Sequence, residues 1–180
     1  MTLRAFLALD LDPAAQQRVV DLMARLGREV AGVRWVRPDG LHLTLRFLGR
    51  ADEPQVARIA AALVEAARSC SPATVPLNEL GLFPERGAPR VLWIGLTLPE
   101  PMLALQRACE DAARREGFDA EERAFKPHLT LGRWKDRAPR PSLPPVDLGA
   151  AQIDHLTLYK SDLKPQGAIY TPLRRFDLGR

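Results

Sequence analysis

The tetrapeptide His-Leu-Thr-Leu occurs at residues 42–45 and again at 128–131, an offset of 86 residues. The same offset links Pro13 to Pro99, and each proline begins a helical pattern of apolar residues. Chance could repeat a tetrapeptide, but it would rarely repeat the strand, proline, helix and strand that surround it. The sequence therefore predicts two halves of similar structure, related by a pseudo-two-fold axis.

Apolar periodicity predicts the elements of each half. We expect a single bilobal α+β domain over residues 1–180, with repeats around 4–49 and 90–135. Its two pseudo-symmetric antiparallel sheets are each backed by helices and enclose a central cleft. Strands are expected at 4–10, 41–48, 74–83, 91–98, 128–134, 151–160 and 168–178, the last at a sheet edge, and helices from Pro13, over 52–69 and from Pro99 to Gly117.

The composition fits one folded domain without a membrane segment. Hydrophobic residues make up 46% of the 180 residues and charged residues 27%, and no apolar run approaches the roughly 20 residues of a membrane span. The N-terminus lacks the pattern of a signal peptide, so we expect a cytoplasmic protein. The net charge of +4 permits an anionic partner such as RNA, although scattered arginines also fit a solvated surface.

The two cysteines, Cys70 and Cys109, lie in alanine-rich helical segments without a Cys-x-x-Cys spacing. This argues against a structural zinc site and against a disulfide framework. We interpret both residues as small buried thiols.

Alternation along a strand places the His and Thr side chains of each tetrapeptide on one face and the two leucines on the other. His42 and Thr44 therefore come from one half, and His128 and Thr130 from the other. If the two halves face each other, two imidazoles and two hydroxyls line one cavity. A pair of histidines in equivalent positions of a repeat has no common packing reason, which favours a functional role over a structural one.

These four side chains suit the cleavage of a phosphodiester. Two imidazoles with ordinary pKa values near 6.5 can take a proton from water and give one to the leaving oxygen. The threonine hydroxyls can donate hydrogen bonds to the phosphate oxygens. Near the histidines no further His, Asp or Glu has metal-ligand spacing, so we expect a metal-independent enzyme without a cofactor.

A third copy of the tetrapeptide begins at His155. It does not fit the 86-residue offset, and a proline-rich loop precedes it instead of a helix. We interpret His155 and Thr157 as part of a strand that matches the motif by coincidence, and a role in lining the site is the alternative.

The paired His-x-Thr-x motifs resemble those of the two-histidine (2H) phosphoesterase superfamily. Within it, the chain resembles the RNA 2′,3′-cyclic phosphodiesterases, also called 2′-5′ RNA ligases or LigT-like proteins. The resemblance extends over nearly the whole chain. The matching stretches are residues 4–10, Trp35, 41–49, 81–84, 125–133, 158–161 and 167–170.

The resemblance implies a bilobal fold with both motifs in a central cleft. It implies hydrolysis of RNA 2′,3′-cyclic phosphate ends to a 2′-phosphomonoester and a free 3′-hydroxyl, and a reversible 2′-5′ ligation. His42 would then protonate the leaving O3′ and His128 would activate water, although the pseudo-symmetry allows the opposite assignment. Thr44 and Thr130 would hold the phosphate. The histidine at position 155 departs from the family pattern.

Further site residues are predicted from position. The resemblance suggests a phosphate contact for Arg133, whereas strict alternation places it opposite His128. Arg46 shares parity with His42 and is a second candidate for the phosphate. Trp35, Phe83 and Tyr170 are candidates for stacking on a base or ribose, with a core position as the alternative.

The expected partner is an RNA or oligonucleotide that ends in a 2′,3′-cyclic phosphate, with tRNA fragments among the candidates. We expect neither a metal nor a membrane partner, and a monomer is the default. Two alternatives stay open: a non-catalytic module that binds RNA ends, and an enzyme with the same chemistry on a small cyclic nucleotide.

Overall fold

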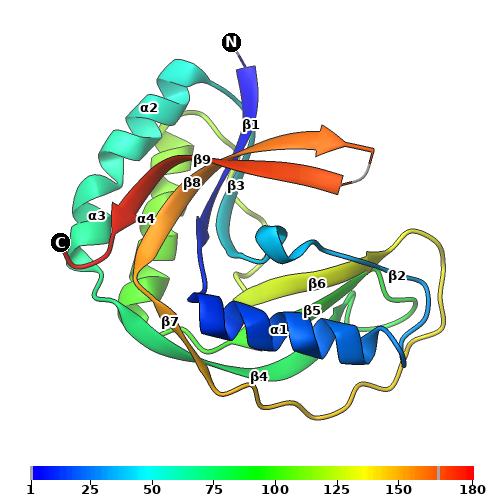
Figure 1. Cartoon of the computed structure of the whole chain (residues 1–180). Coiled ribbons are helices and arrows are strands. Elements are labelled where there is room, and N and C mark those ends of the chain that lie inside the picture. Colours follow the sequence, from blue (N-terminus) through cyan, green and yellow to red (C-terminus); the bar gives the residue numbers. More distant parts are fainter. Residues whose placement is uncertain (1, 166) are drawn as a thin grey trace.

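The computed structural model describes residues 2–165 and 167–180 and has a mixed α/β fold (Figure 1). Most strands and helices lie where the sequence predicts them. In chain order the elements are β1 (Thr2–Leu9), α1 (Pro13–Leu26), β2 (Val33–Trp35), the 3-10 turn η1 (Pro38–Gly40), β3 (Leu43–Asp52), α2 (Glu53–Ala62), α3 (Val64–Ser69), β4 (Ala73–Phe83), β5 (Val91–Leu96), α4 (Glu100–Arg115), β6 (His128–Trp134), β7 (Ala150–Ile153), β8 (His155–Lys164) and β9 (Gly167–Asp177).

Helix capping explains where the first two helices begin. Asp12 precedes α1 and accepts a hydrogen bond from the backbone N–H of Ala15 at 2.9 Å. Asp52 precedes α2 and forms a reciprocal capping box with Gln55. The single helix expected over 52–69 is divided at Leu63 into α2 and α3.

The strand expected over 151–160 is also two strands, separated at Asp154. The first of them, β7, pairs with β4, and the second, β8, pairs with β1. The chain therefore changes neighbours at Asp154 and connects the two ends of the sheet. The predicted edge strand at the C-terminus is confirmed, because β9 pairs only with β8 among the described strands.

The strands form one antiparallel, curled path rather than the two separate sheets expected from the sequence. Within the described residues its order is β7-β4-β5-β6-β3-β1-β8-β9, and β2 pairs with the outer part of β6. The middle of this path is narrow, since β3 and β6 are bridged at the single pair Leu43 and Leu129. These two leucines each follow the histidine of a tetrapeptide, so both motifs meet at the centre of the sheet.

Helices α1 and α4 each pack against a strand on the other side of the β3–β6 junction from the strand that precedes them. Helix α1 follows β1 in the chain but packs against β7, and α4 follows β5 but packs against β3. Helices α2 and α3 contact α4, and Figure 1 shows these three on one side of the molecule with α1 apart from them. In the part of the chain that the structure describes, no helix is both long and apolar enough to cross a membrane.

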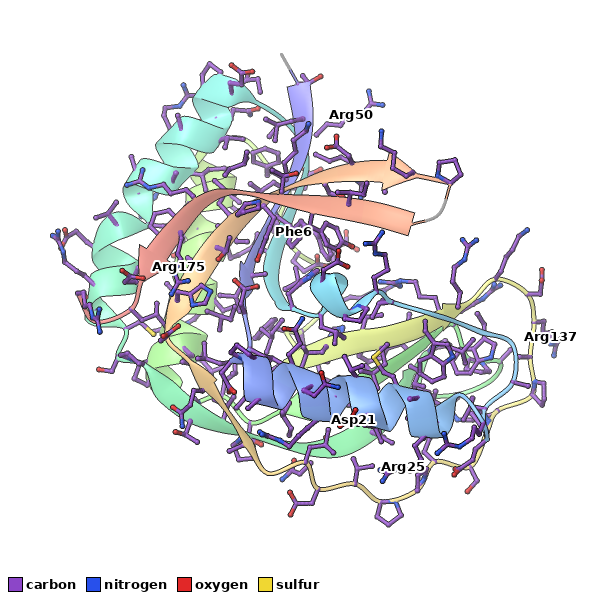
Figure 2. All side chains as sticks on the ribbon, viewed as in Figure 1. Phe6, Asp21, Arg25, Arg50, Arg137 and Arg175 are labelled. Atoms are coloured by element: carbon purple, nitrogen blue, oxygen red, sulfur yellow. The ribbon has the colours of Figure 1, made fainter. Side chains whose placement is uncertain are left out.

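The main hydrophobic core lies between the helices and the sheet. Leu7, Leu43 and Leu129 are fully buried there. The opposite face of the sheet carries aromatic side chains, among them the buried Phe6 and Trp93. Phe6 lies near the middle of the molecule in Figure 2, and charged side chains are spread around the periphery.

Gly81 on β4 lies directly beneath the Trp93 ring, and a Cβ at this position would stand 1.9 Å from Trp93 Cζ2. We predict that Gly81→Ala displaces this buried ring and lowers the free energy of unfolding by about 1–3 kcal/mol. Urea denaturation is the measurement. Asn78→Ala, at an exposed position of the same strand, should stay within about 0.5 kcal/mol of the parent. Equal stability of the two variants would contradict the prediction.

Candidate active site

Both predicted histidines lie at the junction of β3 and β6. The antiparallel register pairs Leu43 with Leu129, so His42 comes opposite Thr130 and His128 opposite Thr44. Alternation from the buried leucines turns all four side chains to the face away from the helices. The two histidines and the two threonines therefore flank the Leu43–Leu129 pair on one face of the sheet.

His42 is half-buried among aromatic rings. Its imidazole stacks on Phe6 with a centroid distance of 4.7 Å, and Tyr170 meets it edge-on at 5.0 Å. Burial lowers the pKa of His42 to about 4, although the charge of Asp10 and a hydrogen bond with the Gly40 backbone act in the opposite direction. His42 is therefore neutral at pH 7 in the free protein.

His128 has a similar setting. Phe83 meets its ring edge-on at 5.1 Å, and Trp93 lies at 6.2 Å. Burial lowers its pKa; a hydrogen bond with the Lys126 backbone opposes this effect, and the charge of Arg133 adds to it. The Nδ1 atom lies 2.6 Å from the Lys126 carbonyl oxygen, which can only accept a hydrogen bond. Nδ1 must therefore carry the proton, and in the neutral ring Nε2 is left as the basic atom.

A bulge at the last residue of each tetrapeptide changes the alternation of side chains. Along the β1–β3 ladder, Leu7 pairs with Arg46 and Ala8 with Thr44, so Leu45 is passed over. Along the β5–β6 ladder, Leu131 is passed over in the same way. A bulge adds one residue to a strand and reverses the face on which the following residues lie. Leu45 and Leu131 are themselves 86 positions apart.

The bulge overturns the prediction for Arg46. Its side chain is 8% exposed and lies on the helix side of the sheet, where Nε is 2.9 Å from a carboxylate oxygen of Glu110 on α4. It also contacts Glu121 at 3.9 Å and donates to the carbonyl oxygen of Asp119. Arg46 therefore anchors β3 to α4 and does not face the cleft. Phe47 takes its place on the cleft side, 5.7 Å from Phe6.

The second bulge has the opposite consequence for Arg133. Strict alternation would have placed it away from His128, but the extra residue turns it to the same face, where it lines a cavity of about 350 Å³. Arg34 on β2 lies directly opposite Arg133 and lines the same cavity. Like charges in opposite positions repel, so the pair marks a place that favours an anion. Arg4 and Arg37 also line this cavity.

The three aromatic candidates take different positions. Trp35 and Tyr170 line the arginine-rich cavity, which leaves both available to a base or ribose. Phe83 is half-buried and contacts Trp93 and His128. Phe47, at 54% exposed, also lines the cavity. Sequence reasoning missed it because simple alternation placed it in the core.

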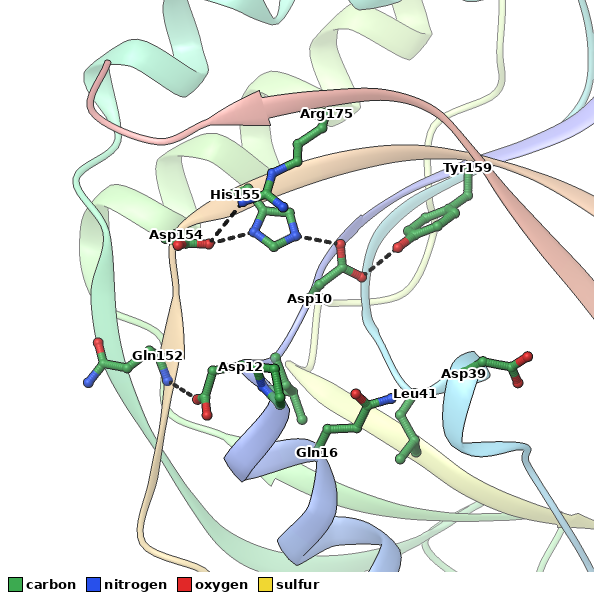
Figure 3. A pocket seen from close by; sticks show the side chains of 12 residues that line it. Asp10, Asp12, Gln16, Asp39, Leu41, Gln152, Asp154, His155, Tyr159 and Arg175 are labelled. Carbon is green, nitrogen blue, oxygen red and sulfur yellow. Dashed lines mark hydrogen bonds and ion pairs between the residues drawn. The ribbon is translucent and has the colours of Figure 1, made fainter.

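The third tetrapeptide lies next to the site through Asp10. His155 and Thr157 on β8 both contact the Asp10 carboxylate, at 3.0 and 2.7 Å, and Tyr159 does so at 2.8 Å. His155 and Tyr159 line a second cavity of about 430 Å³ (Figure 3). Asp10 and Tyr159 were not predicted as site residues. The alternation of Phe6, Ala8 and Asp10 on the face opposite the core was the signal that could have found Asp10.

Comparison with known proteins identifies the family of this chain. The model of the family described as LigT like phosphoesterase matches residues 9–93 and 96–170. The chain belongs to the LigT-like phosphoesterase family. A Methanothermobacter thermautotrophicus protein named RNA 2′,3′-cyclic phosphodiesterase is 34% identical, over 99% of this chain and all of that protein. A Thermus thermophilus protein of the same name is 35% identical, over 98% of this chain and 90% of that protein.

Solved structures of LigT-like proteins share the fold. The protein TT0787 of Thermus thermophilus superposes with a TM-score of 0.88 at 32% identity, over 98% of both chains. The Escherichia coli LigT complex with 3′-AMP gives a TM-score of 0.87 at 27% identity, over the full length of both chains.

For this LigT-like phosphoesterase we predict that His42 and His128 are both neutral at pH 7 in the free protein. Burial disfavours the imidazolium, so both should titrate below 6.5. Saturating inorganic phosphate should move both midpoints to higher pH, because a bound anion favours the charged ring. Histidine side-chain NMR between pH 4 and 8 measures this. A His42 midpoint above 6.5 without phosphate would refute the prediction.

The two bulges lead to opposite predictions for Arg46 and Arg133, because they turn these arginines to opposite faces of the sheet. Arg46→Ala should lower the free energy of unfolding by about 2 kcal/mol or more, because it leaves Glu110 half-buried without its partner. Arg133→Ala should weaken the binding of inorganic phosphate and change stability by less than about 0.5 kcal/mol. Denaturation curves and calorimetric titration separate the two effects. The reverse result would show that Arg46, and not Arg133, faces the cleft.

Proposed function

We propose that this phosphoesterase hydrolyses the 2′,3′-cyclic phosphate at an RNA end to a 2′-phosphomonoester and a free 3′-hydroxyl. The observation that carries the proposal is the register at Leu43 and Leu129, which sets two histidines and two threonines on one face. The relatives named RNA 2′,3′-cyclic phosphodiesterase support the substrate. The LigT complexes with 3′-AMP and with phosphate are consistent with a nucleotide or phosphate in such a site.

The chemistry uses one histidine in each protonation state. Nε2 of neutral His128 accepts a proton from water as the water oxygen bonds to phosphorus. The bond from phosphorus to O3′ breaks, and protonated His42 supplies the proton that O3′ needs. Because His42 is neutral in the free protein, it takes up its proton when the anionic phosphate is bound. Thr44 and Thr130 donate hydrogen bonds to the non-bridging oxygens. With the 5′-hydroxyl of a second RNA end in place of water, the same steps would form a 2′-5′ phosphodiester and release O3′.

The arginine-rich cavity supports an RNA chain over a mononucleotide. Arg4, Arg34 and Arg133 offer contacts to more phosphates than one nucleotide has, and Trp35 and Tyr170 offer rings for stacking. Binding of an oligonucleotide should then weaken as salt concentration rises. A small cyclic nucleotide stays the alternative substrate. The tRNA fragments, the monomeric state and the cytoplasmic location stay predictions.

We also infer that the domain consists of two repeats, the bilobal arrangement expected from the sequence. Helices α1 and α4 begin near Pro13 and Pro99, and both motifs precede a bulge at the same position. The two units would share one sheet through the pair of leucines at its centre. The site then lies on the pseudo-two-fold axis, which explains why it is built from matching residues.

The central test incubates the protein, with EDTA present, with an oligoribonucleotide that ends in a 2′,3′-cyclic phosphate, and identifies the product isomer. We predict a 2′-phosphate and undiminished turnover. His42→Ala and His128→Ala should each lower kcat by about 10²–10⁴. The double variant should lose far less than the product of the two losses, because the residues act in one step.

Arg50→Ala is the matched control, since Arg50 is an exposed arginine on β3, and its kcat should be unchanged. Loss of activity with EDTA that zinc or magnesium restores would refute the metal-independent mechanism. Binding of the RNA end without turnover would instead support the non-catalytic module.

A further inference from the structure

Asp10 is a largely buried carboxylate that the proposed chemistry does not use. Its side chain is 18% exposed and accepts hydrogen bonds from Thr157 at 2.7 Å and from Tyr159 at 2.8 Å. His155 Nε2 lies 3.0 Å from the same carboxylate. A buried charge is costly unless it is paired. Three partners from one strand therefore hold a buried negative charge close to the proposed active site.

His155 completes this network as a cation. Its Nδ1 lies 2.5 Å from Asp154 and its Nε2 faces Asp10, as Figure 3 shows. Two neighbouring carboxylates favour the imidazolium, because only that form can donate from both ring nitrogens. The bond to Asp10 raises the pKa of His155 accordingly. Burial would raise the pKa of Asp10, but its three hydrogen bonds keep it below the ordinary value.

The network reaches His42 through two aromatic rings. Tyr159, whose hydroxyl is held by Asp10, stacks on Phe6 with a centroid distance of 5.2 Å and an interplanar angle of 21°. Phe6 in turn stacks on His42 at 4.7 Å. The orientation of the catalytic imidazole therefore depends on a ring whose far end is fixed by Asp10. Aromatic pairs of this kind have preferred geometries, so a displaced Tyr159 would disturb the whole stack.

We propose that Asp10 is a positioning residue for His42, held by His155, Thr157 and Tyr159, which fixes the aromatic stack and supplies a negative charge that favours the protonated imidazole. This inference rests on the proposed role of His42 as the proton donor. The third tetrapeptide then has a role of its own. Its strand holds Asp10, which positions His42 through the aromatic stack, and it does not contact the substrate.

The groups around His42 define the expected direction of the effect. Asp10 acts from the end of β1, Tyr159 from β8 and Tyr170 from β9, and His128 lies across the junction on β6. Of these, Asp10 carries the negative charge that opposes the effect of burial on His42. The cation at His155 offsets part of that charge. Removing one or the other should therefore move the His42 midpoint in opposite directions.

The experiment compares three variants of the full chain. Asp10→Asn keeps the shape and removes the negative charge, and His155→Gln keeps a donor toward Asp10 and removes the positive charge. Asp136→Asn is the control, because it removes an exposed carboxylate outside this network. The His42 midpoint is followed by histidine NMR with saturating inorganic phosphate, and kcat is followed against pH.

We expect Asp10→Asn to lower the His42 midpoint, to move the alkaline limb of kcat to lower pH, and to reduce kcat at pH 7.5 by about threefold to tenfold. His155→Gln should raise the midpoint, and Asp136→Asn should change kcat by less than about twofold. An unchanged midpoint in Asp10→Asn, or shifts of the same sign in the first two variants, would overturn the proposal. If Asp10→Asn does not fold, the upward shift in His155→Gln alone decides.

The NMR titration does not depend on turnover. Opposite shifts in a protein that fails to cleave the cyclic phosphate would leave this inference standing and refute the proposed function. An active protein whose His42 titration midpoint is unchanged in both variants would support the proposed function and refute this inference.

Discussion

The backbone pairing between Leu43 and Leu129 determines how the sheet is joined and where the two histidines lie. It joins the two halves of the sheet at one pair of residues, and each histidine directly precedes one of these leucines in the sequence. The spacing of these two histidines is consequently set by main-chain pairing in the centre of a sheet and not by loops. The buried leucines that form the pair also anchor the sheet in the helix-facing core.

The surroundings of the two histidines combine opposing electrostatic demands. Aromatic rings bury both imidazoles and favour their neutral forms, whereas a phosphate brought in by Arg133 and its neighbours would favour the charged form. Such a site holds its proton mainly when the anion is present. The carboxylate of Asp10, behind the stack, tunes one histidine alone, so two residues in matching positions need not behave alike.

Periodicity and the repeated tetrapeptide were enough to predict most elements and the four central residues, and the resemblance of the motifs and their flanking stretches predicted the family. Alternation failed after each motif, because a bulge depends on how a neighbouring strand pairs and leaves no mark in the strand's own sequence. Because of these bulges, alternation predicted the wrong face for Arg46 and placed Phe47 in the core. The same effect turns Arg133 to the face of His128, where the family resemblance had placed it. The division of 151–160 at Asp154 likewise follows from which strands are neighbours in space. The single joined sheet could not be inferred from two similar halves.

The crossing of the helices bears on how the chain reaches this structure. Arg18 on α1 donates hydrogen bonds to the carbonyl oxygens of Leu148 and Ala150, 130 and 132 positions away, and α4 covers the strand of the earlier motif. Each half therefore relies on a helix of the other half to cover part of its sheet, so a fragment of either would expose apolar surface. Contacts this distant in sequence slow folding, because the chain must lose the entropy of closing long loops before these contacts can stabilise it. The chain should therefore fold slowly, as one cooperative unit, and only once nearly all of it has been synthesised.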